Sequence, residues 1–341
     1  MQAAAILSIV SMAWLWPSES QINCKTGSLV QLDAETVLAA WYGGTEKHIP
    51  KENDSAETAL WISRLNKGTW SKPECIFQEK GYHVWNPVLV KTASKLYVFF
   101  RKFQAEVAEP QKQRVNRSFT YCVMESDNKG ISWSAPKQLT DGITGPIKSG
   151  PHVLEDGSWI IPSAKKDSCF IERTSDCAKT VTTLGPVTRP NGSQMLSEPT
   201  LVQKNDGTFT LFFRNRQTSP QDRYIMTATF DPKTQKISHA TPTTLPNPDS
   251  GIDCYRLHDG RWLLACNSSF TKRSTLAVYI SSDEGLTWKE ALKVEEGDDE
   301  YSQPALLQAE DGNVHLLYAV WEAKSGKKNI KHVAFAVQSR D

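Results

Sequence analysis

Four side chains that can take part in chemistry stand where apolar runs of this chain begin or end: Glu198, Arg214, Arg273 and Tyr301. A guanidinium group holds a carboxylate through two parallel hydrogen bonds, a geometry that Lys cannot reproduce. A Tyr hydroxyl can act as a neutral nucleophile when a neighbouring carboxylate takes its proton. Together these residue types would suit an acidic substrate. Each one alone is equally compatible with an ordinary role, such as a surface charge, a turn residue or a strand aromatic.

Two short turns give the clearest structural signal. SSDEGLTW, from Ser281 to Trp288, fits the Ser-x-Asp-x-Gly-x-x-Trp pattern called the Asp-box, and SDNKGISW, from Ser126 to Trp133, is a near copy. The Asp of this pattern accepts hydrogen bonds from backbone N–H groups of its turn, and the Gly supplies a backbone angle that a Cβ disfavours. The Trp packs back against neighbouring strands. Such a turn stabilises a hairpin and does no chemistry itself.

A longer repeat accompanies these turns, in which two apolar strands flank a turn that often contains Asp-Gly. Asp-Gly between apolar runs is a strong hairpin signal. The six turns are centred near Asp33, Ala93, Gly157, Gly207, Gly260 and Gly312. Degenerate Asp-boxes begin at Ser63 and Thr174. Six units of about four strands each predict an all-β protein with a six-bladed β-propeller. We expect residues 21–341 to form it as a single domain.

Composition narrows the range of functions. The formal net charge is +1 and no block of basic residues occurs, so a nucleic-acid partner is not expected. No apolar stretch is long enough to span a bilayer. The seven cysteines are widely scattered, with Cys254–Cys266 and Cys169–Cys177 as possible disulfide pairs. Their spacing is not that of a zinc site, and no pattern requires a metal or another cofactor. The oligomeric state is not predicted.

Residues 1–20 have two interpretations. Their apolar run has the length of a signal peptide but lacks the usual basic start. Alternatively, the run is a strand that closes the last blade by pairing with the C-terminal strands. We slightly favour the signal peptide, because four Asn-x-Ser sequons would be usable on a secretory route. These sequons are at Asn53, Asn116, Asn191 and Asn267. The expected location is therefore secreted or lumenal.

From about residue 21 to the C-terminus, the chain resembles the sialidase (neuraminidase) superfamily of BNR/Asp-box propellers, and most closely its shorter sialidase-like branch. The resemblance rests on the Asp-boxes and on SEPTLVQKNDGTFTLFFRNR, KRSTLAVYISSDEGLTW and EYSQPALLQAEDG. It implies that Tyr301 is the nucleophile and that Glu198 accepts its proton. It also implies that Arg214 and Arg273 hold the carboxylate of a sugar.

The acid/base residue and the first carboxylate-binding residue fit the resemblance less well. The loop that resembles the acid/base loop of sialidases, in WYGGTEKHIPKENDSAETALWIS, offers Glu57 and Asp54. Lys25 stands where the superfamily has its first Arg. A Lys binds a carboxylate less directionally than an Arg does. Arg101, at the end of the second inner hairpin, is a candidate to compensate.

Four more residues are candidates for the pocket. Arg216 lies on the same strand face as Arg214 and is a rival for its role. Asn86, Lys148 and Asp253 lie in HVWNPVLV, TGPIKSGPHVL and NPDSGIDCYRL, which also resemble the starts of inner strands in the sialidase-like branch. The Pro, Gly and Ser clusters in these segments fit turns between blades equally well.

The sequence thus predicts an exo-glycosidase that hydrolyses a terminal α-linked sialic acid or a related acidic sugar, with sialylated or other acidic glycans as its partners. Sialidases use a Tyr nucleophile in place of one of the two usual carboxylates. One alternative is an exo-hydrolase or lyase for another acidic sugar on the same scaffold. The other is a non-catalytic propeller that binds carbohydrate or protein, since a fold does not by itself imply a function.

Overall fold

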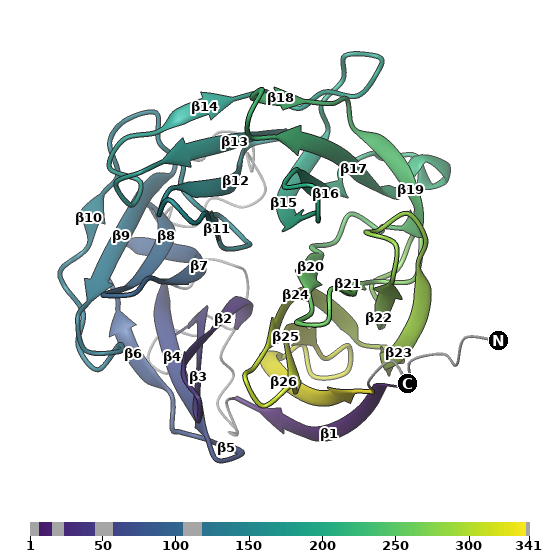
Figure 1. The fold of residues 1–341 in the computed structure, drawn as a ribbon. Coiled ribbons are helices and arrows are strands. Elements are labelled where there is room, and N and C mark those ends of the chain that lie inside the picture. Colours follow the sequence, from purple (N-terminus) through teal and green to yellow (C-terminus); the bar gives the residue numbers. More distant parts are fainter. Residues whose placement is uncertain (1–6, 16–23, 45–56, 105–117, 339–341) are drawn as a thin grey trace.

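The computed structural model describes residues 7–15, 24–44, 57–104 and 118–338. Six antiparallel sheets surround a central axis, each with its first strand innermost (Figure 1). The predicted all-β, six-bladed β-propeller is therefore confirmed. Asp54 and the sequons Asn53 and Asn116 lie outside the described residues.

The first three blades follow one another along the chain. Blade 1 contains β2 (Lys25–Asp33), β3 (Thr36–Gly44), β4 (Thr58–Asn66), β5 (Thr69–Trp70) and β6 (Glu74–Phe77). Blade 2 contains β7 (Tyr82–Lys91), β8 (Leu96–Gln104), β9 (Thr120–Ser126) and β10 (Lys137–Gln138). Blade 3 contains β11 (His152–Val153), β12 (Trp159–Lys165), β13 (Ser168–Thr174) and β14 (Thr182–Leu184).

The other three blades complete the ring. Blade 4 contains β15 (Leu196–Gln203), β16 (Phe209–Asn215), β17 (Tyr224–Asp231), β18 (Lys236–Ile237) and β19 (Thr241–Pro246), with a short 3₁₀ helix η1 (Pro220–Asp222) before β17. Blade 5 contains β20 (Asp253–Arg256), β21 (Trp262–Cys266), β22 (Thr275–Ser281) and β23 (Lys289–Glu296). Blade 6 contains β24 (Glu300–Gln308), β25 (Val314–Trp321), β26 (Lys328–Val337) and β1 (Leu7–Trp14).

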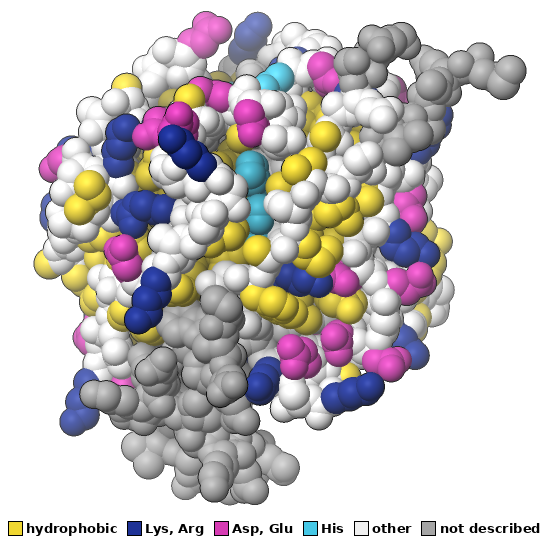
Figure 2. All heavy atoms as spheres, turned by 90° about the horizontal axis from the view of Figure 1, so that it is seen from below, with side chains coloured by type: hydrophobic (Ala, Val, Ile, Leu, Met, Phe, Trp, Pro, Cys, Tyr) yellow, Lys and Arg dark blue, Asp and Glu magenta, His cyan; other side chains and the backbone are white. Residues whose placement is uncertain are grey.

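The strand β1 pairs antiparallel with β26, so the N-terminal residues supply the outermost strand of the last blade. This is the position that the closing-strand interpretation describes. The signal peptide and the secreted location stay predictions. Several apolar side chains of β1 are exposed, namely Ile9, Val10, Met12 and Trp14. Figure 2 views the side of the molecule on which β1 and β5 lie in Figure 1, and hydrophobic side chains form a band across it.

The Asp-box behaves as its sequence predicts. Asp283 Oδ1 accepts hydrogen bonds from Thr287 N at 2.9 Å and from Ser281 Oγ at 2.7 Å. Gly285 has φ +83° and lies against Phe212 and Trp262, so a side chain there would meet both rings. The turn therefore fixes blade 5 against blade 4 at the outer edge, away from the axis.

The inner strands share a local irregularity at their starts. Thr26, Asn86, Glu198 and Gln303 all have positive φ, and each lies in or beside a shift of register with the neighbouring strand. Positive φ is uncommon for residues other than Gly and Asn, and such strain is concentrated at functional sites. The bulge re-aims one side chain at the axial end of each strand. Polar groups from separate blades therefore meet there.

Among the described residues, no helix is both long enough and apolar enough to cross a membrane. All seven cysteines are free thiols, so neither Cys254–Cys266 nor Cys169–Cys177 forms a disulfide.

Candidate active site

Glu198 is the centre of a polar network at the axial entrance. Its Oε2 accepts a hydrogen bond from Arg214 Nη1 at 2.9 Å, and Gln303 Nε2 lies 3.2 Å from the same oxygen. Glu198 is only 8% exposed. Burial raises the pKa of this carboxyl, but the positive charges of Arg214 and Lys148, with the hydrogen bonds, override it and lower the pKa to about 2. Glu198 is therefore a carboxylate at neutral pH.

Asp249 joins the arginines that the sequence singled out. Arg214 Nε donates to Asp249 Oδ1 at 2.8 Å, and Arg216 Nε lies 3.6 Å from the same oxygen. Arg273 Nη2 donates to the backbone oxygen of Asp249, and its Nη1 donates to Glu300 Oε1 at 2.8 Å. Burial by itself lowers the pKa of Arg214, but Glu198 and Asp249 together raise it above its ordinary value. The predicted arginines thus lie on one side of the entrance.

Lys148 crosses the axis. It is 2% exposed and lies in the segment that leads into blade 3, and its Nζ donates to Pro304 O of blade 6 at 2.6 Å. Burial lowers the pKa of Lys148, while the charges of Asp253 and Glu198 oppose that shift. This side chain closes the floor of the entrance and places a cation beside Glu198.

Asp253 ties the blades together, and its role as a pocket residue stays a prediction. Its Oδ1 accepts hydrogen bonds from Ser149 at 2.9 Å and Thr200 at 3.0 Å, and its Oδ2 accepts one from Leu306 N at 2.8 Å. These partners come from three other blades. The Asp253 carboxylate therefore connects these blades at the floor of the entrance.

Tyr301 does not lie beside Glu198, so the predicted nucleophile–base pair is wrong. Its ring packs edge-to-face on Tyr318, with centroids 6.4 Å apart, in the apolar core between blades 5 and 6. Burial raises the pKa of its hydroxyl, with further increases from Glu295, Asp299 and Asp298. Among the described residues no hydrogen bond joins Tyr301 to Glu198. The residue of β24 that reaches Glu198 is Gln303.

The register of β24 explains this correction. Tyr301 pairs with Val320 before the register shift that lies between Ser302 and Ala305. Side chains alternate between the two faces of a strand, and Tyr301 takes the face toward blade 5. Gln303 lies inside the shift with φ +56° and is aimed at the axis instead.

Asn86 and Arg101 approach the entrance from blade 2. Asn86 Nδ2 donates to Ile147 O at 3.0 Å, which ties blade 2 to the segment before blade 3. The Arg101 guanidinium carbon lies 4.5 Å from the Phe119 ring centroid, and its Nε is buried without a hydrogen-bond partner among the described residues. Burial lowers the pKa of Arg101, and the charges of Tyr121 and Glu198 oppose the shift. Arg101 therefore retains an unused donor near Glu198.

The predicted acid/base candidates differ in position. Glu57 is half-buried just before β4, and its Oε1 accepts a hydrogen bond from Gly81 N at 2.7 Å. That contact lies at the blade 1–blade 2 boundary of the entrance face. Asp54 lies outside the described residues, so both acid/base assignments stay predictions.

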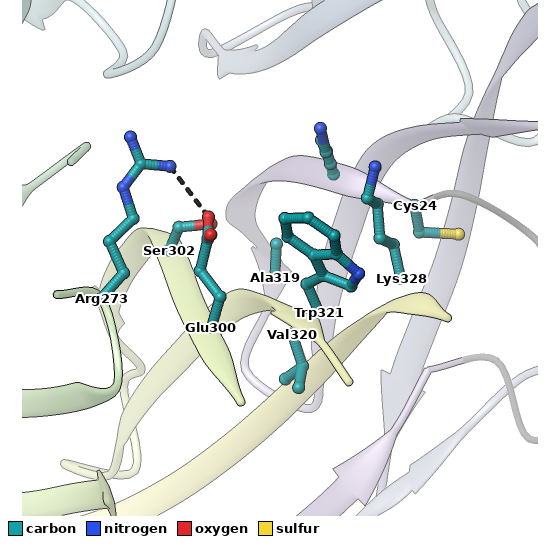
Figure 3. Close-up of a pocket in the computed structure, with 9 residues that line it drawn as sticks. Cys24, Arg273, Glu300, Ser302, Ala319, Val320, Trp321 and Lys328 are labelled. Atoms are coloured by element: carbon teal, nitrogen blue, oxygen red, sulfur yellow. Dashed lines mark hydrogen bonds and ion pairs between the residues drawn. The ribbon is translucent and has the colours of Figure 1, made fainter. Parts of the chain in front are cut away.

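A cleft of about 230 Å³ adjoins the entrance between blades 6 and 1. It is lined by Lys25, Arg273, Glu300, Trp321 and Lys328, among others (Figure 3). Lys25 and Arg273 thus line the same cleft, and the carboxylate-binding role of Lys25 stays a prediction. No group of three or more His, Cys, Asp or Glu residues in the described ranges could hold a metal ion.

Sequence reasoning missed Gln303, Asp249, Glu300 and Trp321. Gln303-Pro304 repeats the arrangement of Glu198-Pro199 and Asn86-Pro87, a polar residue before Pro at the start of an inner strand. This repeated pair of a polar residue and Pro could have indicated Gln303 as a residue of the entrance. The other three are positioned by loops and strand ends, for which the sequence held no comparable repeat.

The Asp-box turns and the polar axial entrance define this protein as an Asp-box β-propeller. Comparison with known families supports this class. The model of the BNR repeat-like domain matches residues 35–316, so the chain belongs to that family. The predicted resemblance to the sialidase-like BNR propellers is confirmed. No curated protein matches this sequence.

Three solved structures illustrate the likeness. The intramolecular trans-sialidase from Ruminococcus gnavus is 14% identical, with 95% of this chain and 96% of that chain covered and a TM-score of 0.69. The NanB sialidase from Streptococcus pneumoniae is 10% identical, with 97% and 70% covered and a TM-score of 0.70. The alpha-L-arabinanase from Penicillium chrysogenum, complexed with arabinobiose, is 15% identical, with 97% and 98% covered and a TM-score of 0.56. At these identities the likeness establishes the fold.

Proposed function

We propose that this protein is a glycoside hydrolase that removes a terminal acidic sugar at the axial entrance, with Glu198 as the reacting carboxylate. The observation that carries the proposal is the state of Glu198. It is an ionised carboxylate on a residue with φ +45°, beside Arg214, Lys148 and Gln303. Strained backbone and a strongly shifted pKa together are typical of active sites.

The position of Tyr301 in the core favours a scheme with two carboxyl groups over one with a phenol nucleophile. In that scheme Glu198 attacks the anomeric carbon or activates water, and a second carboxyl group protonates the leaving oxygen. Glu57, which lies just before β4 on the entrance face, is one proposed acid, and Asp54 is the other. The gain from such a proton transfer is typically about 10²- to 10⁴-fold.

Unused positive donors support an acidic substrate. Arg101 Nε is buried and without a partner among the described residues. The Arg216 side chain is 40% exposed, and its Nε lies 3.5 Å from Asp167 and 3.6 Å from Asp249, longer than a good hydrogen bond. A guanidinium group pairs with a carboxylate through two parallel hydrogen bonds, so both side chains are of the type that holds an acidic sugar. The sialidases among the similar structures agree with a sialic acid, and the arabinanase agrees with a broader range of sugars.

A second candidate is a non-catalytic propeller that binds acidic glycans. It is favoured by the number of contacts within the floor, because Arg214 and Asp253 each bind two or more protein partners. A rigid, pre-formed floor of this kind suits binding as well as catalysis.

A substrate panel separates these functions. The wild type should hydrolyse one of a set of fluorogenic glycosides comprising an α-sialoside, a glucuronide, a galacturonide and, as a neutral control, an arabinofuranoside. Glu198→Gln should lose turnover while keeping its thermal unfolding curve, and the exposed Glu310→Gln should match the wild type. Cleavage of the arabinofuranoside alone would contradict the acidic substrate. Binding of acidic sugars without cleavage would instead establish the non-catalytic function.

A further inference from the structure

Three guanidinium groups converge on Asp249, which lies on the connection between blades 4 and 5. Arg214 Nε donates to Asp249 Oδ1 at 2.8 Å, and Arg216 Nε lies 3.6 Å from the same oxygen. Arg273 Nη2 donates to the backbone oxygen of Asp249, while its Nη1 is held by Glu300 (Figure 3). The Asp249 carboxylate is therefore the shared partner of Arg214 and Arg216.

Arg214 binds two carboxylates that differ in exposure. Its Nη1 donates to Glu198 Oε2 at 2.9 Å, and its Nε donates to Asp249 Oδ1. The Glu198 side chain is 10% exposed and is also contacted by Gln303 Nε2 at 3.2 Å, whereas the Asp249 side chain is 31% exposed. A carboxylate that leaves a guanidinium must regain its hydration, which burial prevents. Asp249 is therefore the one of these two carboxylates that can be exchanged.

The loop around Asp249 is held by hydrogen bonds that do not involve the Asp249 carboxylate. Asn247 Nδ2 donates to Ser250 O at 2.8 Å, and Asn247 Oδ1 accepts from Ser250 N and from Asn215 N, each at 3.2 Å. Asp249 itself has φ +55°, a conformation that Asp and Asn adopt more readily than most residues do. Such strain is concentrated at active sites and ligand clamps. Asn or Gly at position 249 can therefore keep the loop while the carboxylate is removed.

An acidic ligand meets a site that already holds carboxylates. Because Arg214 binds both Glu198 and Asp249, a third carboxylate beside them would be repelled by both. When the Asp249 side chain turns to solvent, Arg214 Nε and Arg216 become available to a carboxylate from the ligand. A neutral sugar gains nothing from that exchange. The Asp249 carboxylate therefore competes with acidic ligands and leaves neutral ones unaffected.

We infer that Asp249 is a specificity-determining residue, and that the carboxylate of an acidic sugar binds between Arg214 and Arg216 by replacing the carboxylate of Asp249. That this sugar is the substrate of Glu198 rests on the proposed function. The exchange of one carboxylate for another stands on the contacts of Asp249 alone.

Calorimetry with glucuronate and glucuronamide tests the exchange, because the two sugars differ only in the group that would replace the Asp249 carboxylate. Neither is a glycoside, so the measurement requires no turnover. Asp249→Asn keeps an acceptor for Arg214 but removes the charge that strengthens the hydrogen bond. We expect Asp249→Asn and Asp249→Gly to bind glucuronate at least about tenfold more tightly than the wild type does. Their affinity for glucuronamide should equal that of the wild type.

Asp167→Asn is the matched control. Asp167 Oδ1 lies 3.5 Å from Arg216 Nε, and among the described residues no ion pair joins Asp167 to Arg214. The change removes one negative charge from the same entrance, so it measures the general electrostatic effect on glucuronate, which should be smaller. Adding Arg216→Gln to the Asp249→Asn protein should remove most of the gain in affinity.

Three results would overturn the inference. The first is that Asp249→Asn and Asp249→Gly, with thermal unfolding curves like that of the wild type, bind glucuronate no more tightly than the wild type. The second is an equal gain in affinity for glucuronamide. The third is an equal gain for glucuronate in Asp167→Asn.

The two proposals fail separately. If no glycoside is hydrolysed but Asp249→Asn gains affinity for glucuronate, the hydrolase proposal fails and the exchange at Asp249 stands. If Glu198-dependent hydrolysis is found but the binding of glucuronate does not depend on Asp249, the exchange fails and the hydrolase proposal stands.

Discussion

The outer turn of blade 5 and the axial floor use the same chemical device over very different distances along the chain. Asp283 binds Ser281 and Thr287, within four residues of itself. Asp253 binds Ser149, Thr200 and Leu306, which are 104, 53 and 53 residues away. The Asp283 carboxylate therefore stabilises one hairpin turn. The floor connects four blades and positions Glu198 with Lys148.

The comparison predicts its largest effect at the floor. Asp253→Ala leaves three hydrogen-bond donors from three blades without their acceptor. It also removes the negative charge that opposes the lowering of the pKa of Lys148. We expect a loss of about 3–5 kcal/mol in the free energy of unfolding, measured by urea denaturation. Asp283→Ala, the matched change at the outer turn, should cost about 1–2 kcal/mol. Equal losses at the two positions would break the distinction between local and cross-blade carboxylates.

A pH dependence tests a second cross-blade contact, at the boundary of blades 6 and 1. Trp70 Nε1 donates to His332 Nδ1 at 3.2 Å, and His332 Nε2 lies 2.9 Å from His315 Nδ1. Burial and the neighbouring His315 lower the pKa of His332 from 6.5 to about 3. Above pH 6.5 the full stabilisation from neutral His332 is present, because the unfolded chain then gains no extra proton.

Between pH 6.5 and 3 the unfolded chain binds this proton and the folded protein does not, so stability should fall as the pH falls. The slope from this group is at most about 1.4 kcal/mol per pH unit. The difference between the wild type and His332→Gln, measured by denaturation at each pH, isolates the effect. The exposed His258→Gln is the control. If the free energies of unfolding of the wild type and His332→Gln changed in parallel across the whole pH range, the lowered pKa of His332 would be contradicted.

The smallest effect is expected within the outer turn itself. Gly285→Ala adds a Cβ at φ +83° that would lie 3.1 Å from Phe212 and Trp262. Gly157→Ala adds one at φ +79° with nothing within 4 Å. The backbone cost, about 1–2 kcal/mol, is common to both. Thermal unfolding should show the larger loss for Gly285→Ala, and an equal loss would mean that the two rings move aside freely.

The contrast between local contacts and contacts between blades explains which features the sequence predicted well. Hairpin turns and Asp-boxes are encoded by neighbouring residues, so six blades followed from their repetition. Glu198 and Arg214 lie on paired strands and form an ion pair, and their roles in a site stay predictions. The error at Tyr301 has a physical cause, because a register shift in β24 changes which side chain faces the axis. No local pattern predicts that shift. The sequence could not predict Asp249 as a site residue either, because its partners Arg214 and Arg273 come from different blades.

The most direct test compares single substitutions at Glu198 and Tyr301, the two residues that the sequence predicts as proton acceptor and nucleophile. The measurement is kcat/KM for the acidic glycoside that the wild type cleaves, with Glu198→Gln and Tyr301→Phe side by side. The account predicts that Glu198→Gln loses at least about 10²-fold and that Tyr301→Phe, whose ring stays in the core, keeps activity close to the wild type. Loss of turnover in a folded Tyr301→Phe, with Glu198→Gln active, would contradict it.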